Sequence, residues 1–540
     1  MSPGSEGGPQ APRHETRTLG ELAAAFLRRH GVEVVFGIPG THNLELYRGL
    51  AREGIRHVLT RHEQGACYAA DGYARATGKP GVVIATSGPG ITNCITGIAN
   101  AYADAVPLLV FSPGPARGEE RRDLGFLHEA KDQRAGIEAF AEESIRVEDA
   151  TALRDAVYGT FARWGVGRRR PVHIELPTDA IGDTYEVDVE EAWSSPPAVA
   201  AAGTIHLAAD AIARSRRPLL VAGGGAVDAA EEVTAFATEF GVPLVTTLAG
   251  KGVVNEHDAL NGGAVAGSSS PAQILADADC IIACGTELKN AGHVAAEATI
   301  VRFDVDAGRL HRHRAAHVPV LGDVALTLPA VAERLRDAGG ARIDPGWADR
   351  AVAAARGHVA GAVERWAGIH RAIVAGAGPN VVLTGDSSQI SYIGTVSVPL
   401  FDAPRRFLST DAYATLGYAL PAAIGASCAR PGTPVVAVVG DGAFMFSVQE
   451  LATARTDTRG LPVLVYDNAG YAEIRQNMAD AGIEPYAVDL PRPDYAALAQ
   501  AFGCAYDRAD DASAVEAAIR VALAREEPTI VHVRAEVYSD

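Results

Sequence analysis

Short apolar segments that alternate with alanine-rich helical segments constrain this sequence most. The apolar segments are rich in Val, Ile and Leu, as at residues 81–85, 219–222, 381–384 and 435–439. Strands that are apolar on both faces belong inside parallel sheets that helices cover on both sides. We therefore expect an α/β fold made of doubly wound parallel sheets.

Two changes in composition divide the 540 residues into three such units. Residues 185–203 are first acidic and then rich in Pro and Ala, and residues 339–345 precede a long helical segment. At about 150 residues per domain, a chain of this length has room for three. We expect the units at residues 16–185, 203–335 and 370–540.

The charge and the first residues exclude several classes of protein. The net charge is −18, from 48 Lys and Arg against 66 Asp and Glu, so the chain repels the phosphates of nucleic acids and anionic membranes. Gly, Pro and polar residues interrupt the long uncharged segment at 81–103, which favours a strand, a turn and a helix over a membrane span. Residues 1–15 lack an apolar core and predict a disordered tail, not a signal peptide. We expect a cytoplasmic protein that binds neither nucleic acid nor membrane.

The last unit carries the pattern most specific for chemistry. An apolar strand at residues 435–439 runs directly into Gly440, Asp441 and Gly442, and a helical segment follows. Glycines let the backbone approach a phosphate closely, and a helix N-terminus supplies amide donors. Asp441 stands at the carboxyl end of its strand, where open parallel sheets bind ligands.

A second polar ending follows on the next expected strand. Residues 461–466 end in Asp467 and Asn468, about one helix and one strand after Asp441. If the two strands are neighbours, Asp441 and Asn468 meet at one edge of the sheet. Carboxylate, amide and backbone carbonyl oxygens are the hard ligands that Mg²⁺ prefers. The sequence therefore predicts a site for magnesium and a diphosphate.

This arrangement resembles the thiamine-diphosphate enzymes, in which the GDG segment is followed one helix and one strand later by an Asn pair. Asp467 replaces the first Asn, whereas the family's metal ligand is retained as Asn468. The resemblance implies thiamine diphosphate and Mg²⁺ as cofactors, with Asp441, Asn468 and the backbone carbonyl of Gly470 as metal ligands. It implies coenzyme contacts around this metal at Gly440, Asp441, Gly442, Ala443, Asn468, Gly470 and Tyr471.

The first unit supplies the residue that resembles the family's activating glutamate. Glu63 follows a short strand at residues 55–59 and begins a helical segment. In the family this glutamate hydrogen-bonds N1′ of the aminopyrimidine and favours the imino form that removes the C2 proton of the thiazolium. Leu416 stands where the family places a bulky aliphatic residue under the thiazolium, although a plain core leucine is the competing interpretation. The resemblance implies further coenzyme contacts at Ser87, Gly88, Pro89, Gln389 and Thr415.

The resemblance covers nearly the whole chain and is nearest to the acetolactate-synthase and 2-oxo acid decarboxylase branch. In that branch Glu63 and the metal site come from different subunits, so it implies at least a homodimer, or a homotetramer, with active sites at the subunit interface. A glycine-rich turn at residues 221–226 of the middle unit is only weakly typical of nucleotide binding. The FAD-contacting residues of acetolactate synthases have no match at residues 281–292, so we favour a middle unit without FAD and keep FAD as the alternative.

The resemblance implies decarboxylation of a 2-oxo acid to an enamine, whose fate is open. Acetolactate synthases typically carry a Trp where Asn477 stands, and residues 39–50, 127–133 and 470–475 resemble the 5-guanidino-2-oxopentanoate decarboxylase subgroup. In these segments His42 and His128 can relay protons near neutral pH, and Glu473 can pair with a cationic substrate tail. Packing histidines and a solvated carboxylate are the competing interpretations.

We therefore expect a thiamine-diphosphate- and Mg²⁺-dependent 2-oxo acid decarboxylase. The alternative is a carboligase that makes acetolactate or another acyloin. A fold of this family that has lost catalysis and serves as a binding subunit is a more remote alternative, because Glu63, Asp441 and Asn468 are all present.

Overall fold

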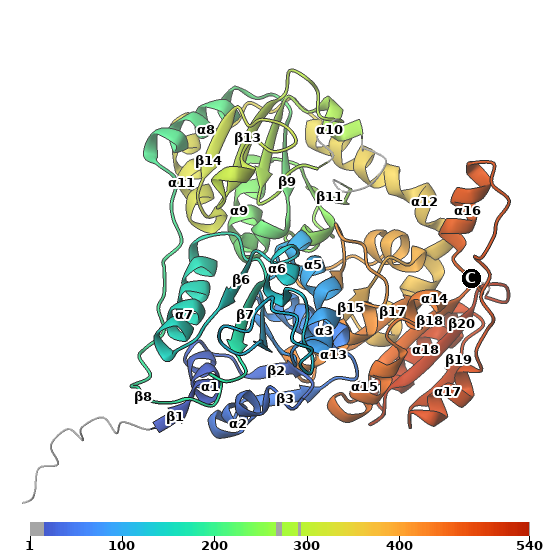
Figure 1. The fold of residues 1–540 in the computed structure, drawn as a ribbon. Coiled ribbons are helices and arrows are strands. Elements are labelled where there is room, and N and C mark those ends of the chain that lie inside the picture. The colour runs from blue at the N-terminus through green and yellow to red at the C-terminus, as the bar shows by residue number, and fades with distance from the viewer. Residues whose placement is uncertain (1–15, 266–272, 290–292, 539–540) are drawn as a thin grey trace, which may run out of the picture.

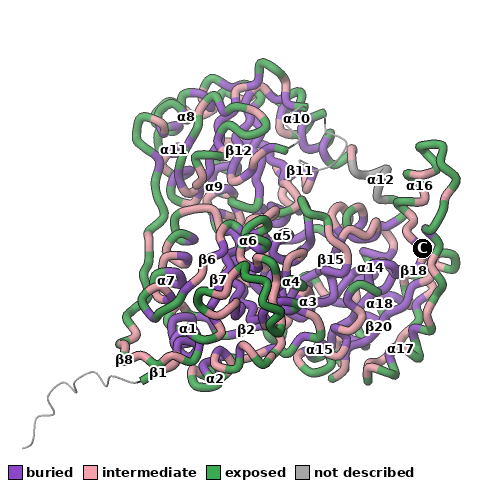
Figure 2. The backbone as a smooth tube through the Cα atoms, in the orientation of Figure 1, coloured by how far each residue is buried: buried purple, intermediate pink, exposed green. Residues whose placement is uncertain are grey.

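Three separate six-stranded sheets form the framework of the chain (Figure 1). The computed structural model describes residues 16–265, 273–289 and 293–538, without the side chains of 359–363. Within each six-stranded sheet the paired strands run parallel. Buried apolar side chains lie on both faces of each sheet. Figure 2 shows that buried residues make up the interior of each unit. The expected doubly wound α/β fold is confirmed, whereas residues 1–15 lie outside the described residues and the bounds of the units stay predictions.

The first unit places its strands in the order β3-β2-β4-β5-β7-β6. These strands are β2 (Val34–Gly37), β3 (Arg56–Leu59), β4 (Gly81–Ile84), β5 (Leu108–Gly114), β6 (Glu143–Arg146) and β7 (Val172–Pro177). The helices are α1 (Leu19–Arg29), α2 (Leu44–Glu53), α3 (Glu63–Thr77), α4 (Pro89–Asn93), α5 (Ile95–Asp104), α6 (Gln133–Glu138) and α7 (Ala150–Val166). A separate antiparallel pair, β1 (Thr16–Thr18) and β8 (Thr184–Glu186), joins the two ends of the unit.

The middle unit has the strand order β11-β10-β9-β12-β13-β14. Its strands are β9 (Pro218–Ala222), β10 (Leu244–Thr246), β11 (Asn261–Ala264), β12 (Cys280–Cys284), β13 (Thr299–Asp304) and β14 (Val318–Leu321). Its α-helices are α8 (Ala202–Arg214), α9 (Ala230–Phe240), α10 (Gln273–Asp277) and α11 (Val324–Asp337). Short 3-10 turns lie at η1 (Gly224–Ala229), η2 (Leu248–Gly250) and η4 (Ala307–Arg309).

The last unit has the strand order β16-β15-β17-β18-β20-β19. Its strands are β15 (Val382–Gly385), β16 (Phe407–Ser409), β17 (Val435–Gly440), β18 (Pro462–Asp467), β19 (Ala505–Arg508) and β20 (Thr529–Arg534). Helical segments are η5 (Ile390–Thr395, a π-helix), α13 (Ala419–Ala429), α14 (Asp441–Phe444), η6 (Val448–Glu450), α15 (Leu451–Asp457), α16 (Ala472–Asp480), α17 (Tyr495–Ala501) and α18 (Ala512–Leu523). Because β17 and β18 are hydrogen-bonded neighbours, the polar residues that follow them meet at one edge of the sheet.

Two connections hold the units together. The long helix α12 (Trp347–Ala377) packs with its first turns on β11 and α10 and with its later turns on α18. Helix α3 of the first unit packs along α13 of the last. Their contact is so close that a Cβ on Gly425 would lie 1.9 Å from the carbonyl oxygen of Ala69. The helix that begins at Glu63 is therefore anchored in the core shared by the first and last units.

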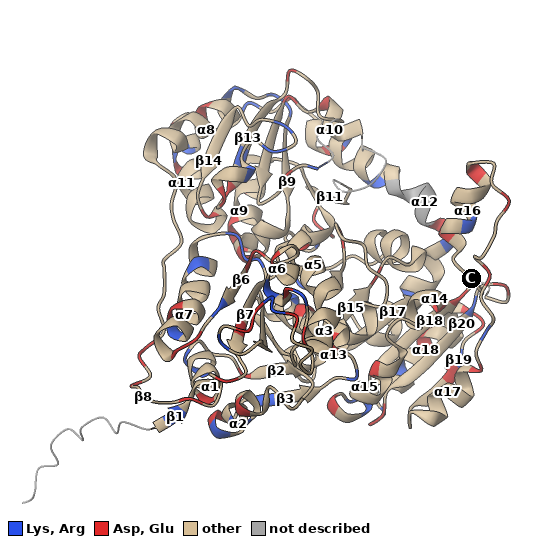
Figure 3. Ribbon diagram, in the orientation of Figure 1, with Lys and Arg blue, Asp and Glu red and all other residues tan. Residues whose placement is uncertain are grey.

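The surface carries charges of both signs. Figure 3 shows Lys and Arg interspersed with Asp and Glu over all three units. Among the described residues, no helix is both long enough and apolar enough to cross a membrane. The expected absence of nucleic-acid and membrane partners stays a prediction.

Candidate active site

The predicted magnesium ligands lie at the carboxyl ends of β17 and β18. Asp441 follows β17 directly, and its Oδ2 accepts a hydrogen bond of 3.1 Å from the backbone N–H of Gly470. Burial and the nearby Asp467 raise the pKa of Asp441. The fold therefore brings Asp441, Asn468 and Gly470 to one corner of the sheet.

Asn468 is the residue of this corner that is suited to a cation. Its Oδ1 atom is buried and has no hydrogen-bond partner within the described part of the chain. A buried amide oxygen without a partner costs about 1–3 kcal/mol, and a metal ion would satisfy it. The residues present therefore fit a hard divalent cation.

Asp467, which stands in place of the family's first Asn, has a different role. Its Oδ2 accepts from Nε2 of His532 at 2.9 Å, and its Oδ1 accepts from Nε of Arg492 at 2.9 Å. Although burial acts in the opposite direction, these hydrogen bonds lower the pKa of Asp467 to about 2. Asp467 is thus a fixed anion that ties β18 to β20.

The glycines of the GDG segment allow neighbouring side chains to pack closely beside the metal corner. A Cβ on Gly442 would lie 2.8 Å from the ring of Tyr471, so a side chain there would displace this tyrosine. The backbone N–H of Gly440 donates to Oγ of Ser388 at 3.0 Å, and Ala443 is buried in the short helix α14. Gly440 and Gly442 thus pack closely against Ser388 and Tyr471, respectively.

Asp386 connects this turn to the loop that carries Leu416, a link that the sequence did not reveal. The fully buried carboxylate accepts from Oγ of Ser388 at 2.6 Å and from the backbone N–H of Gly417 at 3.1 Å. Burial raises its pKa to about 6, although these hydrogen bonds oppose the shift. Its only sequence signal is its place directly after an apolar strand.

Leu416 is partly buried against the core that the first and last units share. The hydroxyl of the preceding Thr415 is hydrogen-bonded to the hydroxyl of Tyr68 on α3 at 2.6 Å. Tyr418 in turn donates to the buried Asp71 of the same helix at 2.5 Å. Helix α3 therefore positions the loop that carries Leu416 within the same chain.

Glu63 is the first residue of α3. The ring of the preceding residue, His62, caps the helix by accepting from the backbone N–H of Gln64 at 3.1 Å. Glu63 is only 8% exposed, and its Oε2 accepts from Nδ2 of Asn93 at 3.0 Å. The carboxylate is thus held at a helix N-terminus, and within the described ranges no group donates a hydrogen bond to Oε1.

His42, Ser87 and His128 form one polar cluster. Nδ1 of His42 lies 2.6 Å from Oγ of Ser87, and Nδ1 of His128 lies 3.4 Å from the same oxygen. The two imidazole rings are 5.1 Å apart, edge to face. Burial and the neighbouring His128 lower the pKa of His42. Three residues expected separately from the sequence therefore share one site, beside Gly88 and the exposed Pro89.

Glu473 and Gln389 also lie together. Nε2 of Gln389 donates to Oε2 of Glu473 at 2.7 Å, and the hydroxyl of Tyr392 donates to the same oxygen at 2.6 Å. Glu473 lies on the exposed surface at the start of α16. Its orientation is therefore fixed by two donors to Oε2, whereas Oε1 has no hydrogen-bond partner among the described residues and can bind a cation.

The glycine-rich turn of the middle unit borders a cavity of about 420 Å³ where the three units meet. Gly224, Gly225 and Gly285 line it together with charged side chains, among them Arg168 and Lys251. The expectation that the middle unit holds no FAD stays a prediction.

Comparisons with known proteins agree with this architecture. Thiamine pyrophosphate enzyme domains match in all three units: the N-terminal TPP-binding domain at residues 17–135, the central domain at 205–331 and the C-terminal TPP-binding domain at 392–533. A probable 2-ketoarginine decarboxylase of Pseudomonas aeruginosa is 38% identical over 97% of this chain and 95% of its own length. The acetolactate synthase large subunit of Parasynechococcus marenigrum is 32% identical over 96% of this chain and 88% of its own length. The large subunit of acetolactate synthase isozyme 2 from Escherichia coli is 31% identical over 94% of this chain and 93% of its own length.

Three parallel α/β sheets, with polar residues at the carboxyl ends of β17 and β18, define the class of enzyme that these three domain models describe. The chain belongs to the thiamine pyrophosphate enzyme family. The family recognised from the sequence is therefore confirmed, and with it a thiamine-diphosphate-dependent enzyme of the 2-oxo acid decarboxylase and acetolactate synthase branch. The remote alternative of a non-catalytic binding subunit is not favoured.

Proposed function

We propose that this enzyme decarboxylates a 2-oxo acid with a cationic, guanidinium-like tail and releases the aldehyde. The observation that carries the proposal is Glu473, whose carboxylate two donors hold in place at the surface near the metal corner. A guanidinium binds a fixed carboxylate with charge-assisted hydrogen bonds. The relative from Pseudomonas aeruginosa, named a probable 2-ketoarginine decarboxylase, supports this substrate class.

Mg²⁺ would bind to Asp441, Asn468 and the carbonyl of Gly470, and it would hold the diphosphate beside Gly440 and Gly442. The buried, unpaired Oδ1 of Asn468 supports this assignment. When bound, the thiazolium of thiamine diphosphate supplies the electron sink that lets CO₂ leave. Leu416 and Thr415 would support that ring, and Tyr471 and Ala443 would line the diphosphate side.

Glu63 would share a proton with N1′ of the aminopyrimidine through its Oε1 atom. Its Oε2 is already engaged with Asn93, so the carboxylate has one defined orientation. Ser87, Gly88 and Pro89 would form the wall beside this ring, and Gln389 would contact the substrate side.

His42 and His128 would deliver the proton that completes the reaction. The carbon–carbon bond to the carboxylate breaks, CO₂ leaves, and an imidazolium N–H bond is exchanged for the aldehyde C–H bond. The contacts of both rings with Ser87 support a short relay. The overall change consumes one proton and the carboxylate anion of one 2-oxo acid, and it yields one aldehyde and one CO₂.

We infer that the active site forms between two subunits, as a homodimer or a homotetramer. Met445 and Phe446 directly follow the GDG helix and are 45% and 50% exposed in the single chain. Large apolar side chains exposed next to a coenzyme site are suited to burial by a partner. Sedimentation of the holoenzyme tests this, and a monomer active at high dilution would contradict it. The cytoplasm remains the expected location.

A panel of 2-oxo acids tests the reaction, with thiamine diphosphate, Mg²⁺, CO₂ detection and product identification. We expect 5-guanidino-2-oxopentanoate to give the aldehyde faster than pyruvate gives any product. Acetolactate formed from pyruvate at a higher rate would favour the second candidate, a carboligase, which the acetolactate synthase relatives keep open.

A further inference from the structure

One buried amide side chain joins the active-site turn to the rest of the first unit. Gln133, the first residue of α6, is 6% exposed, and its Oε1 accepts a hydrogen bond of 2.8 Å from the backbone N–H of Gly88. Its Nε2 donates to Oε2 of Glu175 at 2.7 Å and to the carbonyl of Pro113 at 2.9 Å. An amide with both ends satisfied is held in a single orientation.

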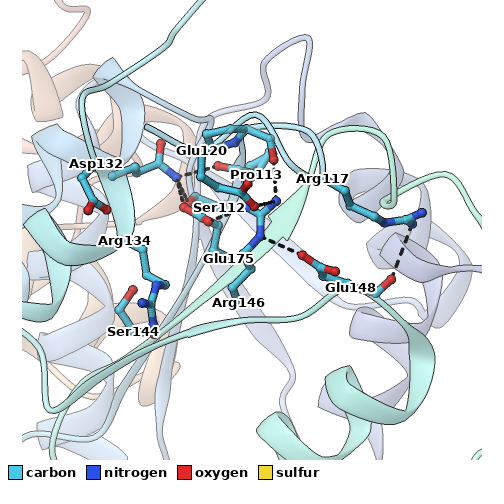
Figure 4. Close-up of polar contacts among 12 residues, drawn as sticks. Ser112, Pro113, Arg117, Glu120, Asp132, Arg134, Ser144, Arg146, Glu148 and Glu175 are labelled. Carbon is cyan, nitrogen blue, oxygen red and sulfur yellow. Dashed lines mark hydrogen bonds and ion pairs between the residues drawn. The ribbon is translucent and has the colours of Figure 1, made fainter. Parts of the chain in front are cut away.

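The partner of this amide is itself fixed. Glu175 on β7 is 1% exposed, and its Oε1 accepts from NH1 of Arg146 at 2.8 Å. Arg146 also donates to the carbonyl of Pro115 at 2.9 Å. Figure 4 shows its further hydrogen bond to Glu148, at 3.1 Å. Charge-assisted hydrogen bonds of this kind are stronger than neutral ones, so the network anchors Gln133 from the side away from the active site.

The turn that Gln133 holds has no room for adjustment. Gly88 has φ +58°, and a Cβ there would lie 2.4 Å from the carbonyl oxygen of His128. Ser87, the preceding residue, contacts Nδ1 of both His42 and His128. The backbone of His128 therefore restrains this turn on one side and Gln133 on another.

We propose that Gln133 is a positioning residue for proton delivery: it sets the place of Ser87, and through Ser87 that of the His42 and His128 rings. This rests on the proposed function, in which these rings protonate the carbon from which CO₂ has left. Misplacement by about 1 Å can slow a reaction about 100-fold. Loss of Gln133 should therefore slow release of the aldehyde by a larger factor than it weakens coenzyme binding or slows C2 proton exchange.

A cavity next to Gln133 makes a selective rescue experiment available. It measures about 390 Å³ and is lined by Gln133, Glu175 and Arg146 together with the exposed Arg121. Gln133→Ala would open space for acetamide, which can accept from Gly88 and donate to Glu175. Gln133→Met removes the same hydrogen bonds but fills the space. Glu148→Gln, which changes the exposed end of the network, is the matched control.

The first measurement needs neither coenzyme nor turnover. In the apoprotein, hydrogen exchange followed by mass spectrometry should be faster in the peptide containing Gly88 for Gln133→Ala and Gln133→Met than for the wild type. In the holoenzyme both variants should form aldehyde about 10- to 100-fold more slowly, and acetamide should restore Gln133→Ala only. Acetone, which lacks the amide donors, should restore neither.

Two results of the measurements on the holoenzyme would overturn the proposal. One is aldehyde formation within twofold of the wild type despite faster exchange at Gly88. The other is an equal loss of coenzyme affinity and of rate without any effect of acetamide, which indicates a purely structural role. A wild-type enzyme that is inactive on every 2-oxo acid would contradict the proposed function instead. In that case, hydrogen exchange at Gly88 that is the same in the Gln133 variants as in the wild type would still refute the role of Gln133.

Discussion

The hydroxyl oxygen of Ser87 lies 2.6 Å from Nδ1 of His42, a contact between residues 45 positions apart in the chain. Ser87 ends the turn after β4, and His42 precedes α2. Their contact, with His128 on the same oxygen, places two imidazole rings where one proton relay can use both.

The relay predicts a particular dependence on pH. Burial and His128 lower the pKa of His42, so its proton-donating form is lost at a lower pH than for an ordinary histidine. In His128→Gln the neighbouring charge is gone and the pKa of His42 rises. The alkaline limb of kcat for aldehyde formation should move to higher pH, while kcat falls about 10- to 100-fold. An unshifted limb would argue against the coupling of the two rings.

Removal of a metal ligand should weaken coenzyme binding. Asn468→Ala eliminates the unpaired amide oxygen at the metal corner. We expect the Kd for thiamine diphosphate at fixed Mg²⁺ to rise about 100-fold, since even indirect metal contacts contribute 10- to 100-fold. Isothermal calorimetry measures it, with the exposed Asn477→Ala of α16 as control. Equal affinities for both variants would remove Asn468 from the metal site.

Glu473→Gln should change substrate choice and leave the chemistry intact. The substituted side chain keeps its size but loses the charge that would pair with a guanidinium. We expect KM for 5-guanidino-2-oxopentanoate to rise about tenfold, equivalent to about 1.4 kcal/mol, with KM for pyruvate unchanged. The exposed Glu484→Gln is the control. An equal rise in KM for pyruvate would show that Glu473 does not bind the guanidinium tail of the substrate.

Gly88→Ala should destabilise the first unit. The substitution forces a side chain to φ +58° and brings its Cβ within 2.4 Å of the carbonyl oxygen of His128. Gly31→Ala is the matched control, because Gly31 has φ +75° but nothing within 4 Å of its added Cβ. Backbone strain alone costs about 1–2 kcal/mol, so in urea unfolding Gly88→Ala should lose more stability than Gly31→Ala. Equal losses in the free energy of unfolding would mean that the turn at Gly88 can move to accommodate the side chain.

The sequence predicted the sheets and the pairing of Asp441 with Asn468 because both depend on local patterns. Apolar segments such as 435–439 became strands almost residue for residue, and Asp441 and Asn468 could be paired because their strands follow one another in the chain. The sequence did not single out Asp386, whose carboxylate the fold places against Ser388 and Gly417.

Gln133 could not be found from the sequence at all. Its contacts with Gly88 and Glu175 join residues more than 40 positions apart, from three elements whose packing no local pattern specifies. In the sequence it is only the last residue of the segment 127–133, which resembles a decarboxylase subgroup. The tertiary structure shows that its side chain is buried and hydrogen-bonded at both ends.

The central claim is that Glu63 activates thiamine diphosphate in this enzyme. Proton–deuterium exchange at C2 of the bound coenzyme, followed by NMR in wild type and Glu63→Gln, tests it most directly. Both proteins should fold and bind the coenzyme, and the substitution should slow exchange about 100- to 10,000-fold. Exchange at the wild-type rate in Glu63→Gln would contradict the account.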